Sequence, residues 1–228
     1  MTSAPAIELR GLSRYFGERT ALREVTLQVP DGATVAVLGR NGAGKSTLLR
    51  ILASLLRPHA GEVEVFGERL PRRAFAVRAK VGLLAHEPLL YRELSARENL
   101  EYHARLHRVG TERVGELLEA VEFERRADEP VRTLSRGMVQ RVAVCRAVLH
   151  RPSLLLLDEP RANLDPAASA LVEPLIGRSS GATRILTSHD PAAALREADL
   201  VLGLDQGRAA FVKEPGQIEP SELEALYR

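Results

Sequence analysis

The sequence predicts an α/β fold. Short β-rich runs alternate with helical patterns along its 228 residues, and no internal repeat or low-complexity tract interrupts this alternation. Hydrophobic residues make up 45% of the chain and charged residues 27%, a balance that is typical of a globular protein and too apolar for a disordered one. The length suits one large domain or two small ones.

Two strands and a helix are expected near the beginning. Residues 24–29 alternate between apolar and polar side chains, as in a half-buried strand, and residues 34–38 form the apolar run of a buried central strand. A glycine-rich turn follows. Residues 44–56 then have a helical pattern, which Pro58 should end because the residue before a proline avoids the helical region.

Helical patterns dominate the middle of the chain. Ser95 and Glu98 have the Ser-x-x-Glu spacing of a capping box, so a helix should begin there. Two more helices are expected over about 111–121 and 137–150. We therefore expect a helical insertion near 88–150.

Strands should return in the last third of the chain, at 154–157, 184–187 and 200–204. Between them, Asp165-Pro166 and Asp190-Pro191 each have the pattern of a helix start, with aspartate as the capping residue and proline at the first helical position. The α/β alternation thus resumes after the helical insertion.

The composition argues against several classes of protein. With 32 basic and 30 acidic residues the net charge is +2, and aromatic residues make up only 4%, so no surface for nucleic acid is expected. No apolar run approaches the roughly 20 residues that cross a bilayer, and residues 1–10 lack the pattern of a secretory signal. We therefore expect a cytoplasmic protein. The single cysteine, Cys145, is interpreted as a packing residue.

A phosphate-binding motif is the strongest functional signal. It fits G-x-x-x-x-G-K-[ST], lies between an expected strand and an expected helix, and consists of Gly39, Arg40, Asn41, Gly42, Ala43, Gly44, Lys45 and Ser46. Glycines allow successive backbone N–H groups to surround a phosphate chain, and the helix N-terminus attracts anions. The Lys45 ammonium should bind the β- and γ-phosphates, and the Ser46 hydroxyl should bind Mg²⁺. Only three of the 32 basic residues are lysines, which supports a specific need for lysine here.

Two carboxylates form the second motif. Asp158 and Glu159 follow the apolar run 154–157, as expected for a buried strand that delivers acids to the carboxyl edge of a sheet. The phosphate loop should lie on the same edge. Asp158 would hold Mg²⁺ directly or through water, and Glu159 would orient or deprotonate the attacking water.

Residues 7–210 resemble the nucleotide-binding subunits of ABC transporters. The resemblance implies that residues 1–228 form a single ATP-binding domain, with a P-loop NTPase core of the ABC ATPase type. An N-terminal β subdomain and the helical insertion at 88–150 would complete it. The implied cofactors are ATP and Mg²⁺. A GTPase is disfavoured because the chain has no Asn-Lys-x-Asp motif to read guanine.

The family signature Leu-Ser-Gly-Gly-Gln has a counterpart at 134–138, which departs from it at Arg136 and Met138. In the family, the serine and the second glycine contact the γ-phosphate bound by the other subunit. The resemblance therefore gives these roles to Ser135 and Gly137. An ordinary serine N-cap is the alternative interpretation of Ser135.

Other positions that match the family would complete the nucleotide site. Asp165 matches a loop that crosses the dimer interface, His189 matches the switch histidine, and Thr47 extends the phosphate loop. Phe16 matches the aromatic residue that stacks on adenine. Tyr15 could substitute for it, and core packing is the alternative for both. The alternative for His189 is a polar surface position.

His86 stands where relatives usually carry a glutamine that senses Mg²⁺ and the attacking water. We expect it to contribute to metal binding and to catalysis. The segments 82–88 and 90–100 resemble the haem-exporter ATPase of the cytochrome c maturation system, and the altered signature at Arg136 and Met138 points the same way. Other small exporter ATPases share these features.

The resemblance implies an ATPase subunit that powers an exporter, with haem for cytochrome c biogenesis as the expected cargo. Its partners would be a second copy, with two ATP molecules between them, and a membrane-embedded subunit at the cytoplasmic face of the inner membrane. The alternative is the ATPase of another small exporter of a drug, lipid or polysaccharide. A non-transport ABC ATPase acting on ribosomes or DNA is disfavoured, because only the stretch 47–134 separates Ser46 from Ser135, with no long coiled coil and no second cassette.

Overall fold

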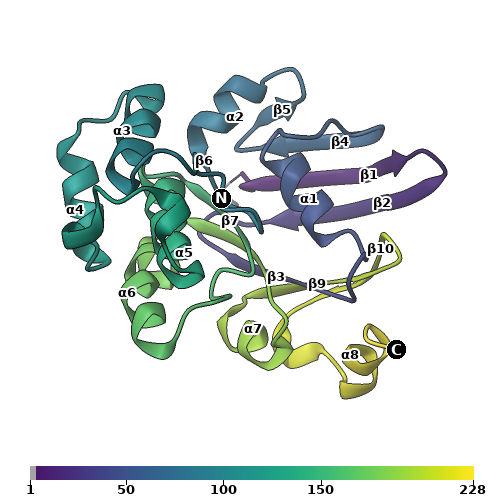
Figure 1. The fold of residues 1–228 in the computed structure, drawn as a ribbon. Helices are drawn as coiled ribbons and strands as arrows, with labels where there is room; N and C mark the ends of the chain where they lie inside the picture. Colours follow the sequence, from purple (N-terminus) through teal and green to yellow (C-terminus); the bar gives the residue numbers. More distant parts are fainter. Residues whose placement is uncertain (1–3) are drawn as a thin grey trace.

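The computed structural model describes residues 4–228 and has the expected α/β architecture, built on two β-sheets (Figure 1). The strands are β1 Ile7–Phe16, β2 Arg19–Val29, β3 Thr34–Leu38, β4 Ala60–Val65, β5 Glu68–Leu70, β6 Val81–Leu84, β7 Leu154–Asp158, β8 Thr183–Thr187, β9 Leu200–Asp205 and β10 Arg208–Lys213. The α-helices are α1 Lys45–Leu52, α2 Ala74–Lys80, α3 Ala96–His107, α4 Glu112–Ala120, α5 Arg136–Val148, α6 Pro166–Ile176, α7 Pro191–Glu197 and α8 Pro220–Ala225. Short 3₁₀ turns connect several of them.

The larger sheet positions the site. Its six strands have the order β10-β9-β3-β8-β7-β6, and all pair in parallel except β10, which runs antiparallel to β9 at the edge. The carboxyl ends of parallel strands meet at one edge of a sheet. The loops that follow β3, β6, β7 and β8 therefore emerge side by side, and these loops carry the phosphate motif, His86, Glu159 and His189.

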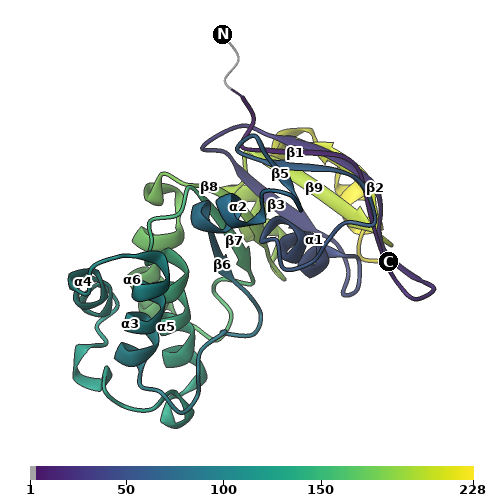
Figure 2. The same cartoon turned by 90° about the horizontal axis from the view of Figure 1, so that it is seen from above.

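The smaller sheet has the order β2-β1-β4-β5 and is antiparallel throughout. It packs on one side of the larger sheet with α1, while α3, α4, α5 and α6 lie on the other side (Figure 2). Successive residues of β7 point to opposite faces of the sheet. Leu154 and Leu156 pack in the core beneath the smaller sheet and α1, and Leu155 and Leu157 pack in the core on the side of α3 to α6. A strand covered on both faces must be apolar at every position, which explains the unbroken run of leucines.

Most of the expected elements are present. The strands at 34–38, 154–157, 184–187 and 200–204 match β3, β7, β8 and β9 within a residue or so. Ser95 caps α3 through a complete capping box with Glu98. Asp165 and Asp190 cap α6 and α7, each with proline at the first position.

The helix expected over 44–56 is shorter than predicted. It spans Lys45–Leu52, because Ser54 adopts a left-handed conformation with φ 60° and both Leu55 and Leu56 donate their N–H groups to the Arg50 carbonyl. The turn, and not Pro58, ends this helix. The first expected strand is longer than 24–29, since β2 begins at Arg19.

Three helices, α3, α4 and α5, occupy the stretch in which the helical insertion is expected. The longest helix of the described residues, α5, has 13 residues. No helix within residues 4–228 combines the length and the apolar character needed to cross a membrane.

Candidate active site

The phosphate loop connects β3 to α1 and is shaped by its glycines. Gly39 has φ 142° and Gly44 has φ 110°, conformations that side chains rarely adopt. A Cβ atom would also collide with the Leu204 carbonyl at Gly39 and with the Ala21 carbonyl at Gly44. Gly44 caps α1 without any side-chain hydrogen bond, so the first turn of this helix is not closed by the chain's own side chains.

Lys45 lies inside this loop. Its Nζ atom donates to the carbonyls of Gly39 at 2.6 Å and Arg40 at 3.1 Å. Burial lowers the pKa of Lys45 below its usual value, while the nearby carboxylates of Glu159 and Asp158 act in the opposite direction. A half-desolvated ammonium at the mouth of a glycine loop is a strong partner for phosphate.

Thr187 organises the two acids. This buried residue at the end of β8 donates its hydroxyl to Asp158 Oδ1 at 2.7 Å and accepts the Glu159 N–H at 3.1 Å. Glu159 has φ 55°, a left-handed conformation that turns the chain sharply at the end of β7. Asp158 is thereby held in a buried position, 8% exposed, while Glu159 faces the loop after β8.

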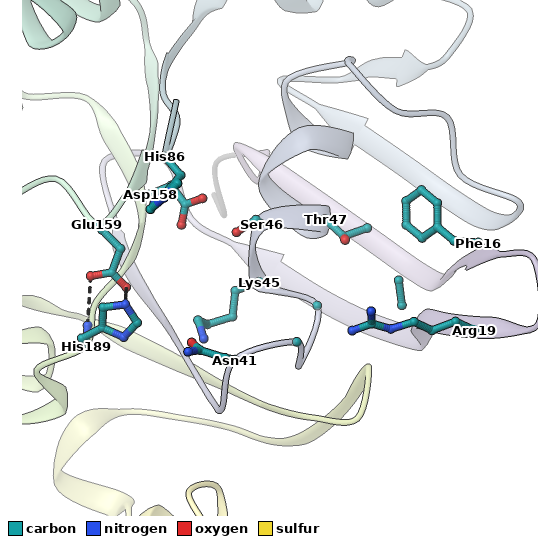
Figure 3. A pocket seen from close by; sticks show the side chains of 13 residues that line it. Phe16, Arg19, Asn41, Lys45, Ser46, Thr47, His86, Asp158, Glu159 and His189 are labelled. Carbon is teal, nitrogen blue, oxygen red and sulfur yellow. Dashed lines mark hydrogen bonds and ion pairs between the residues drawn. The ribbon is translucent and has the colours of Figure 1, made fainter. Parts of the chain in front are cut away.

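Glu159 contacts His189 through both carboxylate oxygens. Oε2 accepts the His189 backbone N–H at 3.1 Å, and Oε1 lies 3.3 Å from His189 Nε2 (Figure 3). The His189 side chain is otherwise 70% exposed, whereas that of Glu159 is 15% exposed. A carboxylate retains further lone pairs after two such contacts, so Glu159 can still accept a proton from water.

A cavity of about 420 Å³ collects the expected groups at the carboxyl edge of the sheet (Figure 3). Its lining consists of Phe16, Arg19, Ala21, Asn41, Gly42, Gly44, Lys45, Ser46, Thr47, His86, Asp158, Glu159 and His189. The structure therefore brings together residues from the phosphate loop, the acidic pair and the loops after β6 and β8. The combination of a phosphate cup and acids beside it is suited to nucleotide hydrolysis.

The residues at the centre of this cavity fit a magnesium ion. The Ser46 hydroxyl and the Asp158 carboxylate point toward one another, and the Asp158 Oδ2 atom remains available beside the oxygen that Thr187 holds (Figure 3). Mg²⁺ prefers such hard oxygen donors and keeps several waters. His86 offers a nitrogen, so it suits a contact with metal-bound water better than direct ligation.

A second cavity, of about 510 Å³, borders the same acids from the side of α5. His86, Asp158 and Glu159 line it together with Arg136, Gln140 and Asn163. It contains neither Lys45 nor the glycines of the phosphate loop. The first cavity is therefore the one that fits the phosphates, although the second is larger.

The signature residues do not line the nucleotide cavity of their own chain. Ser135 caps α5 by accepting the Met138 N–H at 3.3 Å, which agrees with the N-cap interpretation. Gly137 lies close to the loop after β7, where a Cβ atom would come within 2.8 Å of the Asn163 carbonyl. Asp165 is likewise absent from the cavity and caps α6.

The two aromatic residues considered for stacking on adenine differ in their position relative to the cavity. Phe16 lines the cavity and is 45% exposed, while Tyr15 stacks on His59 outside it. Neither side chain packs in a core, so the alternative of core packing is wrong for both. An exposed aromatic ring at the entrance of a phosphate site is suited to stacking on a base.

Several residues of the site were missed by the sequence analysis. Arg19 lines the cavity, and its guanidinium would lie 3.0 Å from a Cβ atom at Gly42. Thr187 lies two residues before His189, and no sequence motif gives it a role. Tyr227 lies near Gly39. Burial raises the pKa of its hydroxyl, a hydrogen bond with the Gly39 backbone opposes this, and the Glu159 charge adds to the increase. The contact of Tyr227 with Gly39 has no local sequence signal, because the two residues lie far apart in the sequence.

The sequence comparisons identify the family. A family model described as ABC transporter matches residues 22–162. The chain is 39% identical, over 89% of its length, to the daunorubicin resistance ATP-binding protein DrrA3 of Streptomyces coeruleorubidus. Over 98% of its length it is 36% identical to the phosphonates import ATP-binding protein PhnC of Anaeromyxobacter dehalogenans. Over 97% of its length it is 34% identical to the Nod factor export ATP-binding protein I of Ralstonia nicotianae.

The structural comparison agrees. A dimeric structure of the ATP-binding cassette MJ0796 in a post-hydrolysis state, bound to ADP and Pi, is 27% identical and has a TM-score of 0.83, covering 92% of this chain and 98% of that one. The chain therefore belongs to the ABC transporter family, as an ATP-binding ATPase domain. It spans 66% of the length of DrrA3, 48% of PhnC and 71% of the Nod factor protein.

Proposed function

We propose that this chain is the ATP-hydrolysing subunit of an ABC-type exporter and acts as a single domain, with residues 88–150 as its helical subdomain. The observation that carries the proposal is the cavity in which Lys45, Ser46, Asp158 and Glu159 converge. Lys45 and Ser46 follow β3, and Asp158 and Glu159 stand at the end of β7. All four serve one task, the cleavage of a phosphoanhydride.

The chain's own residues divide that task. The N–H groups of the glycine loop and the Lys45 ammonium hold the phosphates, and Ser46 and Asp158 would hold Mg²⁺. The ion would neutralise charge on the phosphate oxygens. Glu159 accepts the proton of the attacking water, and His189 orients Glu159 through the contacts described above. His86 would contact the water shell of the ion.

A second copy of the chain would complete the site. Ser135, Gly137 and Asp165 lie outside the cavity of their own chain, which supports their action on a nucleotide held by the partner copy. The Ser135 hydroxyl can accept the Met138 N–H and still donate its own hydrogen to a phosphate oxygen. The two interpretations of Ser135, cap and phosphate ligand, are therefore compatible.

A membrane-embedded subunit would dock beside His86. Leu89, Tyr91, Tyr102 and Leu106 are exposed apolar side chains, between 39% and 61% exposed, in α3 and the loop that leads to it. The rings of Tyr91 and Tyr102 meet edge to face at 5.3 Å. An exposed apolar patch whose loop begins just after His86 suits a partner that senses the nucleotide state, at the cytoplasmic face of the membrane.

The cargo is a separate question. Haem export rests on the resemblance of the segments 82–88 and 90–100 and on the altered signature at Arg136 and Met138, and none of the relatives reported above is named for it. The names daunorubicin resistance and Nod factor export support the broader proposal of a small exporter, whereas the phosphonate relative is named for import. We therefore propose export, with haem as one cargo to be tested.

Turnover by the purified chain tests the enzymatic part. We expect phosphate release from ATP that stops when EDTA removes divalent cations and returns with Mg²⁺. Release at the same rate without divalent cations would contradict the roles of Ser46 and Asp158. Binding of haem to a complex with the membrane subunit, compared with binding of an anthracycline, tests the cargo.

A further inference from the structure

Arg161 joins the two loops that carry Glu159 and His189. It lies two residues beyond Glu159, in the segment between β7 and α6. Its Nη2 atom is 2.8 Å from Glu173 Oε2 on α6 and 3.0 Å from Glu197 Oε1 on α7. Because α7 begins directly after the loop of His189, a single guanidinium bridges the connection after β7 and the helix after β8.

Glu197 is itself fixed to the central sheet. Its Oε2 atom lies 3.1 Å from Nη1 of Arg184, a β8 side chain that is only 1% exposed. Arg184 also donates to Thr34 Oγ1 from Nε at 3.1 Å and from Nη2 at 2.9 Å. A buried guanidinium with these partners cannot rearrange freely, so the Glu197 carboxylate that Arg161 meets has a fixed position.

Apart from the hydrogen bonds between Thr187 and the two acids, the space between the two loops is open. A cavity of about 340 Å³ separates them, lined by Glu159, Arg161, His189 and Glu197 among others. On its nucleotide side the loops meet through Glu159 and His189, and on its far side through Arg161 and Glu197. Gln140 of α5 holds the same segment from another direction by donating to the Pro160 carbonyl at 3.1 Å.

We propose that Arg161 is a positioning residue for hydrolysis: its ion pair with Glu197 sets the distance between Glu159 and His189. The proposal rests on Glu159 being the base. Arg161 is 43% exposed, and exposed ion pairs add little to overall stability, so its loss should leave the fold intact. The geometry of a base and its orienting group is far more sensitive, because a displacement of about 1 Å can cost about a hundredfold in rate.

Three variants test the proposal in the full chain with Mg-ATP. Arg161→Met removes the charge but keeps the length of the side chain, and Arg161→Lys keeps the charge. Arg178→Met is the matched control, because Arg178 binds the Glu197 carbonyl at 2.9 Å and Asp199 at 2.7 Å without touching the loop of Glu159. Steady-state kcat and KM, together with the melting temperature, are measured for each.

We expect Arg161→Met to lower kcat about tenfold with KM changed less than about twofold, and Arg161→Lys to recover most of the lost rate. Arg178→Met should stay within about twofold of the wild type. A wild-type kcat in Arg161→Met, or an equal loss in Arg178→Met, would overturn the proposal. If Arg161→Met does not fold, the Lys variant decides: a loss of more than about tenfold despite the retained charge would also overturn it.

Glu159→Gln measured in the same assay separates this proposal from the assignment of the base. Near wild-type turnover in Glu159→Gln would overturn the role of Glu159 and with it the positioning role. An inactive Glu159→Gln beside an unaffected Arg161→Met would overturn the positioning role alone.

Discussion

Two helices of this molecule start at positions that we assign to the nucleotide, α1 after the phosphate loop and α5 after Ser135, and their first turns differ. In α1 the capping residue is Gly44, no side chain closes the turn, and Lys45 fills the loop. In α5 the Ser135 side chain accepts the Met138 N–H. The first helix faces the cavity of its own chain and the second does not.

Under the proposed function, the α1 half of the site is complete within a single chain, and the α5 half acts on the nucleotide of the second copy. The α1 end gathers the groups that bind phosphate. The α5 end is closed by the Ser135 cap and would offer the Ser135 hydroxyl and Gly137 to a nucleotide held by the partner copy. Binding should therefore depend mainly on α1, and turnover should depend on both ends. The changes below test this division.

Glu159→Gln should have the largest effect. Turnover should fall at least about a hundredfold, because the amide cannot accept a proton. Both helix starts remain intact in this variant, so a dimer with trapped ATP should accumulate on size-exclusion chromatography with Mg-ATP. Only monomer under these conditions would contradict the joint site.

Lys45→Ala removes the charge at the α1 start. The affinity for ATP should fall about tenfold to a hundredfold, the range for losing a charge-assisted hydrogen bond. Isothermal titration measures it. Lys80→Ala, at the end of α2 and outside the cavity, is the control. Wild-type affinity for ATP in Lys45→Ala would contradict the assignment of this loop to phosphate binding.

Ser135 offers a sharper test of the α5 start. Ser135→Ala loses both the cap and the hydroxyl donor, whereas Ser135→Asp keeps a capping group but presents a negative charge. ATP-dependent dimer formation should weaken about tenfold in both, with unchanged affinity of the monomer for ATP. Only the Ala variant should lose stability, by about 1 kcal/mol. If Ser135→Asp dimerised normally, Ser135 would be a cap alone.

The other end of α5 should respond to acid. Burial is the main cause that lowers the pKa of His103 and of His150 to about 4, with added repulsion from Arg146 and His107. For His150 a hydrogen bond to the Val81 carbonyl opposes this slightly. The folded state therefore disfavours the protonated rings.

Because both pKa values are lowered in the folded state, acid should destabilise the fold. The contribution of the neutral rings to stability is complete above the ordinary histidine value near 6.5 and is lost as the pH falls toward about 4. The melting temperature should drop between pH 7 and pH 5, and less so in His150→Gln, whose amide can still donate to Val81. An identical drop of the melting temperature in the wild type and in His150→Gln would show that groups other than His150 cause the acid sensitivity. This is the smallest of the expected effects.

Much of the fold was predictable because its signals are local. The capping box at Ser95 and the aspartate-proline pairs at Asp165 and Asp190 fixed three helix starts, since a cap needs only the next three residues. Unbroken apolar runs located the buried strands. The strand pair β4–β5 and the helix α2 were not predicted, because β4 is placed by pairing with β1, β5 by pairing with β4, and α2 by packing against β5 and β6.

The site divides in the same way. The phosphate loop and the acids were found as contiguous motifs, but Arg19, Thr187 and Arg161 act through contacts with distant parts of the chain. Thr187 lies next to Asp158 only because β8 pairs with β7 in register. No pattern in the sequence encodes that register, so it had to come from the structure.

The lone thiol has a practical consequence for spectroscopy. Cys145 is fully buried in α5, and burial raises its pKa to about 12. Thiol-reactive labels need an accessible thiolate, so Cys145 in the folded protein should not react with maleimide dyes. A cysteine introduced at exposed Thr133 would then be the one labelled position per copy. Energy transfer between the dyes on two such copies would then report how the copies close around ATP, with no need to replace Cys145.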